Sequence, residues 1–219
     1  MALIPEGQRE AIKERLGAME GPVKLVMFTE EGPECPYCRE TRQLLEELTE
    51  LSEKLTAEVH FFQEEKGLAE RFGVDKVPAI IFLGEDEKDY GMRFYGIPTG
   101  YEFVTLLEGI LDVSRGSTAL SERTKEVLRR LKRDVHIQVF VTPTCPYCPG
   151  AARLAHQMAL ESEKVRADVV EATEFPHLAA RYHVLAVPKT VINEVLWLEG
   201  AVPEDHLLRE VAKAGGVEL

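Results

Sequence analysis

The stretch that decides the fold occurs twice, as Cys35-Pro36-Tyr37-Cys38 and as Cys145-Pro146-Tyr147-Cys148. These two tetrapeptides contain all four cysteines of the chain. An apolar run precedes each of them, at 24–29 and at 137–142, and a helix-like segment follows. A strand, then C-x-x-C, then a helix is the context in which this motif indicates a dithiol redox centre.

The second tetrapeptide follows the first at an offset of 145 − 35 = 110 residues. The same offset relates Val77-Pro78 to Val187-Pro188, and it relates 71–74 to 181–184. Three landmarks in register indicate that a whole unit is duplicated, and a period of this length is the size of a domain. The sequence therefore predicts two tandem domains.

The boundary between the domains is expected where apolar periodicity is lost, at 112–118. We assign 1–116 to the N-terminal unit and 117–219 to the C-terminal unit. In each unit the periodicity predicts a helix, then strand–helix–strand, then a short helix, a β-hairpin and a closing helix. In the first unit the main helix is expected to run from 39 to 55, because Leu44, Leu48 and their successors lie three or four residues apart.

Alternation of this kind predicts an α/β fold, with a mixed four- to five-stranded sheet in each unit and helices on both faces of the sheet. Phe94 and Trp197 fall in the two hairpins and are expected in the core.

The composition limits the classes of partner and the compartment. The net charge of −12 argues against nucleic acid and anionic membranes as partners. The start of the chain shows no secretory signal, and no apolar run approaches the ~18 residues of a membrane span. Strictly paired cysteines without such a signal favour a cytoplasmic redox or metal-binding protein.

The cysteines differ in the roles that the chemistry predicts for them. Thiol–disulfide exchange needs a thiolate, and the unpaired N–H groups and dipole at a helix N-terminus lower the pKa of a nearby thiol. Cys35 and Cys145 are predicted to be the exposed nucleophiles at the helix starts, followed by prolines at the first helical position. Cys38 and Cys148 lie one turn further on and are predicted to be the resolving thiols.

The tetrapeptides and the Val-Pro dipeptides together resemble the thioredoxin superfamily, and Cys-Pro-Tyr-Cys resembles its glutaredoxin version. Two such units in tandem resemble the protein disulfide oxidoreductases (glutaredoxin-like proteins) of thermophilic archaea and bacteria. This resemblance implies an enzyme that reduces, oxidises or isomerises protein disulfides. It also implies cis prolines at 78 and 188, each preceded by backbone that pairs with a client peptide; the other reading is a trans proline that opens a strand.

The resemblance and the position beside each dithiol together suggest a client-binding surface. Its predicted residues are Pro36, Tyr37, Val77 and Pro78 in the first unit, and Pro146, Tyr147, Val187 and Pro188 in the second. For Tyr37 and Tyr147, a simple surface position is an equally good reading.

The resemblance further implies client proteins with disulfides or thiols, a thioredoxin reductase as electron donor, and peroxiredoxin-type clients. The redox groups would be the Cys35–Cys38 and Cys145–Cys148 disulfides, with no metal and no other cofactor. No Gly-rich nucleotide-binding loop is present in the sequence. Thioredoxins place an acid in the strand before the dithiol, whereas 24–28 and 137–140 contain none.

Two other classes of protein remain open at this point. One is a peptide-binding chaperone or adaptor without catalytic activity. The other is a structural zinc protein, although C-x-x-C pairs in a zinc site are normally ~15–20 residues apart and here 106 residues intervene. Arg39 follows the first dithiol and Pro149 the second, so we predict that the two sites differ in reduction potential.

Overall fold

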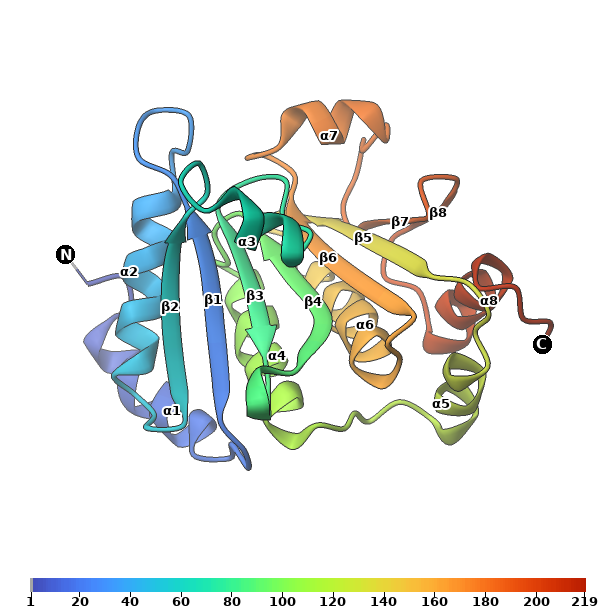
Figure 1. Cartoon of the computed structure of the whole chain (residues 1–219), viewed down its shortest axis with the longest axis horizontal. Coiled ribbons are helices and arrows are strands. Elements are labelled where there is room, and N and C mark those ends of the chain that lie inside the picture. Colours follow the sequence, from blue (N-terminus) through green and yellow to red (C-terminus); the bar gives the residue numbers. More distant parts are fainter. Residues whose placement is uncertain (1) are drawn as a thin grey trace.

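The computed structural model describes residues 2–219 as one mixed sheet that is covered by helices on both faces (Figure 1). The strands are β1 Val23–Thr29, β2 Leu55–Phe61, β3 Ala79–Leu83, β4 Asp89–Tyr95, β5 Val135–Val141, β6 Val165–Glu171, β7 Lys189–Ile192 and β8 Leu196–Glu199. The helices are α1 Glu6–Leu16, α2 Cys38–Thr49, α3 Lys66–Arg71, α4 Glu102–Arg115, α5 Glu122–Arg129, α6 Cys148–Glu161, α7 Pro176–Arg181 and α8 Glu204–Ala214, with a 3₁₀ turn η1 at Glu85–Glu87.

The strand order is β2-β1-β3-β4-β6-β5-β7-β8, so each unit contributes four neighbouring strands. This confirms two tandem units with mixed sheets. The two sets of strands join into one sheet because β4 pairs with β6 in parallel, from Met92 opposite Ala167 to Tyr95 opposite Val170. The junction covers an edge of the first unit with a strand of the second.

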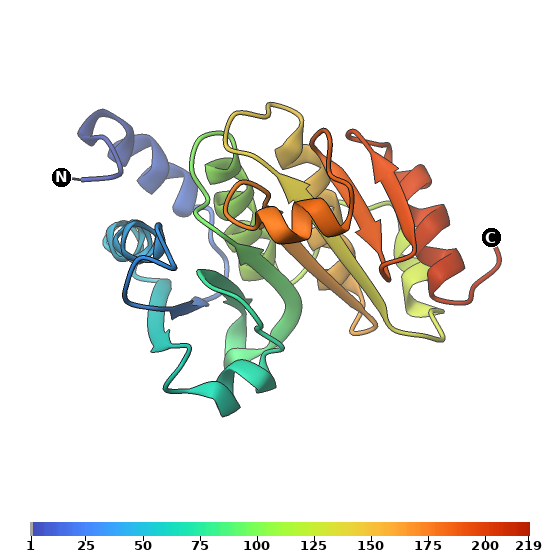
Figure 2. The same cartoon turned by 90° about the horizontal axis from the view of Figure 1, so that it is seen from above.

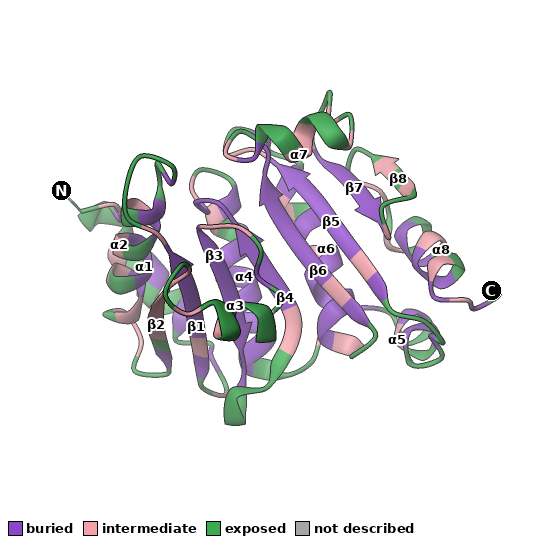
Figure 3. Ribbon diagram, turned by 45° about the horizontal axis from the view of Figure 1, so that its top comes forward, coloured by how far each residue is buried: buried purple, intermediate pink, exposed green. Residues whose placement is uncertain are grey.

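Helices cover the two faces of the sheet unequally. Side chains from α1, α2, α4, α5, α6 and α8 pack on one face in a large core, and α3 and α7 cover the other face with a smaller one. Figure 2 shows these two layers from above. Because most of β1 and β5 is covered on both faces, these strands are nearly continuous apolar runs and do not alternate with polar residues; Figure 3 shows them as buried.

Both dithiols lie at the same edge of the sheet. β1 is antiparallel to β3, which is antiparallel to β4, and β4, β6 and β5 are mutually parallel. β1 and β5 therefore run in the same direction, and the loops at their C-terminal ends carry the two C-x-x-C motifs. Three strands lie between them, which corresponds to a separation of about 19 Å at ~4.8 Å per strand.

Two predictions about individual elements were wrong. The helix expected to reach residue 55 ends at Thr49, because Leu55 pairs with Val23 as the first residue of β2. The position of Leu55 in the apolar spacing fits a helix, but its pairing with β1 determines its structure. Trp197, expected in the core, is exposed because β8 is an edge strand with only β7 beside it, whereas Phe94 is fully buried as predicted.

Buried polar contacts join the two units behind the sheet. Arg153 on α6 forms ion pairs with Glu108 and Asp112 on α4, at 2.9 and 3.1 Å. His156 Nε2 donates a hydrogen bond to the carbonyl oxygen of Arg93 at 3.0 Å, and burial lowers the pKa of this imidazole to about 4. These contacts hold the two units in one arrangement.

The helices of the described chain are too short or too polar to cross a bilayer; the longest, α4 and α6, have 14 residues each.

Candidate active site

The first dithiol occupies the turn between β1 and α2. Cys35 and Cys38 form a disulfide with their Cα atoms 5.5 Å apart, and the Cys38 N–H donates to the carbonyl oxygen of Cys35 at 3.4 Å. α2 begins at Cys38, so the prediction that Pro36 is the first helical residue was wrong. Pro36 lies at the second position of the turn, for which its fixed φ is well suited.

The second dithiol repeats this geometry between β5 and α6. Cys145 and Cys148 form a disulfide with the same Cα separation of 5.5 Å, and the Cys148 N–H again donates to the carbonyl oxygen of the first cysteine. α6 begins at Cys148, so Pro146 also precedes its helix. The duplicated sequence therefore produces duplicated local structure.

The two cysteines of each pair differ in accessibility. Cys35 and Cys145 retain 6% and 7% of their surface, whereas Cys38 and Cys148 retain 2% and 0%. The difference has the predicted sign, although even the first cysteine of each pair is well covered. An approaching sulfur atom can reach Cys35 or Cys145 more easily than its partner.

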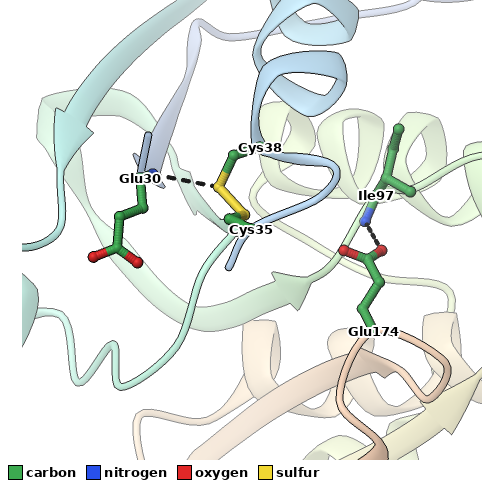
Figure 4. The surroundings of a disulfide bond; sticks show 5 residues. All are labelled: Glu30, Cys35, Cys38, Ile97 and Glu174. Atoms are coloured by element: carbon green, nitrogen blue, oxygen red, sulfur yellow. Dashed lines mark hydrogen bonds between the residues drawn. A yellow bond between two sulfur atoms is a disulfide. The ribbon is translucent and has the colours of Figure 1, made fainter. Parts of the chain in front are cut away.

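A backbone amide points at the buried sulfur of the first pair. The N–H of Glu30 donates to Sγ of Cys38 at 3.3 Å, as Figure 4 shows. A donated hydrogen bond favours the charged form of a sulfur over the neutral thiol. Reduction of the disulfide would thus leave a thiolate acceptor beside a donor that is already in place.

Each Val-Pro dipeptide precedes a strand that pairs with the C-terminal end of β1 or β5, and both peptide bonds are cis, as the resemblance implied. Cys145 Sγ is 3.7 Å from the carbonyl oxygen of Val187. The carbonyl oxygens of Pro78 and Pro188 accept hydrogen bonds from Gly96 and Gly200 at 2.9 and 2.8 Å, which tie each loop to the strand beyond it.

The remaining predicted residues border the dithiols at the surface. Tyr37 and Tyr147 are both exposed, as are Pro36 and Pro146. A cavity of about 530 Å³ opens beside Cys35 and contains charged side chains in its lining. These charged side chains are Glu30, Glu31, Arg39, Glu40 and Arg42.

Two acids, one partly and one fully buried, lie where the two units meet, and neither comes from the strand that precedes a dithiol. Glu174, in the loop after β6, reaches across to the first unit and accepts a hydrogen bond from the Ile97 N–H at 2.6 Å. Figure 4 shows this carboxyl in the surroundings of the Cys35–Cys38 disulfide. Burial, opposed by the Ile97 hydrogen bond and reinforced by the charge of Glu171, raises the pKa of Glu174 to about 7.

A second acid, Glu102, lies in the first turn of α4 in the first unit and is fully buried. The adjacent Tyr101 N–H donates to the carbonyl oxygen of Pro143, in the loop that leads to Cys145. Burial, opposed by the Thr105 hydroxyl and reinforced by Glu171, raises the pKa of Glu102 to about 7. Neither acid was predicted from the sequence, because nothing in the local sequence connects either of them to a dithiol of the other unit.

The arrangement of the cysteines is incompatible with one zinc site of four sulfurs. Zinc holds each thiolate sulfur at about 2.3 Å, so all four would have to converge on a single point. The two pairs are instead separated by three strands of the sheet, and each pair is closed by its own disulfide.

Comparisons with known proteins agree with the duplicated architecture. A family model described as a thioredoxin-like domain matches residues 9–110, and one described as a thioredoxin domain matches 135–213. A structure of the NTD_N/C domain of an alkyl hydroperoxide reductase from Enterococcus faecalis is similar in fold, with a TM-score of 0.88, 23% identity, and coverage of 95% of this chain and 99% of that one.

Among curated proteins, the F subunit of the alkyl hydroperoxide reductase of Pseudomonas putida is 22% identical over 208 residues, which are 95% of this chain and 37% of that protein. The chain spans about a third of the length of the curated relatives it matches.

A solved protein disulfide oxidoreductase from Aeropyrum pernix K1 is 33% identical, and the similarity covers 98% of this chain and 96% of that chain with a TM-score of 0.90. Similarity at this level over nearly the full length of both proteins, with both C-x-x-C pairs closed as disulfides, shows thiol–disulfide exchange as the activity. The chain therefore belongs to the family of protein disulfide oxidoreductases built from two tandem thioredoxin folds.

Proposed function

We propose that both dithiols exchange disulfides with client proteins, with Cys35 and Cys145 as attacking thiols and Cys38 and Cys148 as resolving thiols. The observation that carries this assignment is the repeated difference in burial: in each unit the first cysteine is the more accessible and the second is almost completely covered.

Reduction of a client would proceed in two exchanges. The thiolate of Cys35 or Cys145 attacks one sulfur of the client disulfide, forms a mixed disulfide and releases the other client sulfur as a thiolate. The resolving thiolate then attacks the mixed disulfide, which closes the C-x-x-C pair and releases the second client thiol. The enzyme pair gives up two electrons, which the client receives; the reverse sequence oxidises a client.

The local structure supports formation of the thiolates. Each first cysteine precedes the first turn of α2 or α6, where unpaired N–H groups and the helix dipole stabilise negative charge. At the first site, the Glu30 N–H supplies a further donor to Cys38. Lower thiol pKa values would give more of the reactive form at neutral pH.

The client backbone is proposed to lie along Val77-Pro78 or Val187-Pro188, with the prolines and tyrosines of the tetrapeptides beside it. In the described residues, the N–H groups of Val77 and Val187 have no hydrogen-bond partner. With the Val187 carbonyl oxygen 3.7 Å from Cys145 Sγ, this backbone could pair with an extended peptide next to the reacting sulfur.

The electrons are proposed to come from a thioredoxin reductase, and peroxiredoxins are proposed among the clients. The resemblance implies both partners, and the relatives named as F subunits of alkyl hydroperoxide reductases support a link to peroxide reduction. We further propose that the protein works in the cytoplasm, that its disulfides are its only redox groups, and that its units divide at 116/117.

Single-site proteins test the assignment. C145S/C148S keeps only the first dithiol and C35S/C38S only the second, and each is expected to reduce insulin with dithiothreitol. C35S/C145S, which lacks both attacking thiols, is expected to lose the activity. In addition, C38S and C148S should accumulate mixed disulfides with a client, whereas C35S and C145S should not. Full insulin reduction by C35S/C145S would contradict the proposal and favour a different attacking sulfur.

A further inference from the structure

The two dithiols have the same geometry but very different surroundings. Positions 30–42, which span the first dithiol, contain six charged residues, and the equivalent positions 140–152 contain none. The charged residues are Glu30, Glu31, Glu34, Arg39, Glu40 and Arg42. The cis-proline loops continue this contrast, with Asp and Lys in 74–78 and no charge in 184–188.

Leu185 shows the contrast most clearly. It lies three residues before Pro188 and its side chain is 95% exposed. The equivalent position in the first unit is Asp75, which forms an ion pair with Lys76 at 2.5 Å. Leu185 is almost completely exposed, so packing within the described chain does not account for an apolar residue at this position. Asp75, by contrast, is an ordinary solvated residue.

Two aromatic side chains of the second unit are exposed as well. Tyr147, between the cysteines of the second pair, is 71% exposed. Trp197 is 63% exposed, and its ring centroid lies 5.9 Å from Lys189 Nζ. The same Nζ donates to the carbonyl oxygen of His183 at 3.0 Å, so Lys189 connects Trp197 to the loop that carries Leu185.

These three residues, Tyr147, Leu185 and Trp197, form what we call the apolar rim of the second dithiol. Cys145 contacts Val187. Tyr147 is two residues from Cys145 and Leu185 is two residues from Val187, and two residues of chain span at most about 7 Å. An extended client a few residues long, attached to Cys145, would therefore reach Leu185 and Tyr147.

We propose that the apolar rim is the docking surface of the second dithiol for extended client segments that carry apolar side chains next to the reacting cysteine, and that Leu185 sets this preference. The inference rests on the proposed function of the dithiol. The first dithiol, which has Asp75 in place of Leu185 and six charged residues in 30–42, has no such preference. The two sites of one chain would thus select different clients.

The test compares single-site proteins on matched substrates with dithiothreitol as the electron source. C35S/C38S retains only the second dithiol, and C145S/C148S only the first. The substrates are two short peptides closed by a disulfide, one with Leu and Phe beside a cysteine and one with Ser at both positions. Bis(2-hydroxyethyl) disulfide, which lacks side chains, reports exchange chemistry alone.

The second-site protein is expected to reduce the apolar peptide with a kcat/KM about tenfold higher than the serine peptide, since burial of one apolar side chain contributes this much or more. Leu185→Asp in this protein should abolish the preference and leave the rate with bis(2-hydroxyethyl) disulfide unchanged. Val195→Asp, at another exposed apolar residue, which precedes β8 at the end of that strand away from the dithiol, should retain the preference.

A second measurement uses the only tryptophan of the chain. When C35S/C38S/C148S holds the apolar peptide on Cys145 as a mixed disulfide, Trp197 emission should shift to the blue, and the serine peptide should cause no shift. Equal rates with both peptides, a preference that persists in Leu185→Asp, or the same preference at the first dithiol would overturn the inference. Failure of both single-site proteins on bis(2-hydroxyethyl) disulfide would instead refute the proposed function.

Discussion

Glu174 of the second unit accepts a hydrogen bond from the backbone N–H of Ile97 in the first unit, with 2.6 Å between nitrogen and oxygen. The contact is close enough that a side chain at Gly96 would collide with the Glu174 carboxyl. The Gly96 N–H in turn donates to the carbonyl oxygen of Pro78, the residue before β3. An acidic side chain of one unit is thereby held against the segment of the other unit that is hydrogen-bonded to Pro78.

The first prediction concerns Glu174 and the reactivity of Cys35. The pKa of Glu174 is raised to about 7, so the carboxyl is largely neutral at pH 6 and charged at pH 8. A negative charge near Cys35 disfavours its thiolate. In the reduced C145S/C148S protein, Glu174→Gln should therefore increase alkylation of Cys35 by iodoacetamide roughly two- to tenfold at pH 8 and hardly change it at pH 6.

Gln at position 174 can still accept the Ile97 hydrogen bond, so the loop should be preserved. Glu14→Gln, at an exposed glutamate on α1, provides the control and should alter neither rate. An equal effect of Glu174→Gln at both pH values would rule out ionisation of Glu174 as its cause.

The second prediction concerns Glu102 and folding stability. Its folded-state pKa of about 7 lies above its value in the unfolded chain, near 4.5. Between these values the folded state binds more protons, so the contribution of Glu102 to the free energy of unfolding is highest below pH 4.5 and is lost as the pH rises through 7. Glu102→Gln removes this penalty and should stabilise the protein by roughly 1–3 kcal/mol at pH 8.

Urea unfolding of the oxidised protein at pH 5 and pH 8 measures this effect, and at pH 5 the variant should be close to the wild type. Glu108→Gln is the matched comparison on α4. It should destabilise the protein at both pH values, because Arg153 loses an ion-pair partner at 2.9 Å. Similar behaviour of the two variants would show that burial without an ion-pair partner is not what distinguishes Glu102.

The residues that could be predicted from the sequence are those whose role is set by local geometry. Cys35 and Cys38 form a disulfide because two intervening residues complete one turn, and the same tetrapeptide identifies the second pair. Pairing between distant strands was not predictable in the same way. Leu55 was assigned to a helix by its spacing, and Glu102 and Glu174 were missed, because the β4–β6 junction that brings the units together leaves no periodic signal in the sequence.

Trp197 illustrates the same point from the opposite direction. Its position in β8 corresponds to that of Arg93 in β4, since both lie opposite equivalent residues of the preceding strand. Arg93 is buried because β6 covers its strand, whereas no strand in the described chain covers β8. The pattern of apolar and polar residues alone does not show which of the two equivalent strands, β4 or β8, has another strand beside it.

The third prediction concerns the two reduction potentials. The first dithiol has Arg39, Glu40 and the Glu30 N–H around it, and the second has the uncharged first turn of α6. Thiolates in such different fields should differ in stability, so the potentials of C145S/C148S and C35S/C38S should differ by at least about 30 mV, a tenfold change in the exchange equilibrium. Titration of each protein against dithiothreitol measures both values, and coincident midpoints would contradict the prediction.

The last prediction uses two glycines near the second dithiol. Gly100 has a φ of +60°, and a side chain there would collide with the carbonyl oxygen of Pro143, which also accepts the Tyr101 N–H. Gly100→Ala must therefore adopt strained backbone and displace the loop that leads to Cys145. We expect a loss of roughly 1–3 kcal/mol in the free energy of unfolding.

Gly150 is the matched control, because it lies in the first turn of α6 and a methyl group added there would have no atom within 4 Å of it. Gly150→Ala should stabilise the helix by about 0.5–1 kcal/mol. In the C35S/C38S background, Gly100→Ala should also slow insulin reduction, while in C145S/C148S it should leave the rate unchanged. If Gly100→Ala were as stable as Gly150→Ala, or slowed both single-site proteins equally, the contact between α4 and the second dithiol would not position that site.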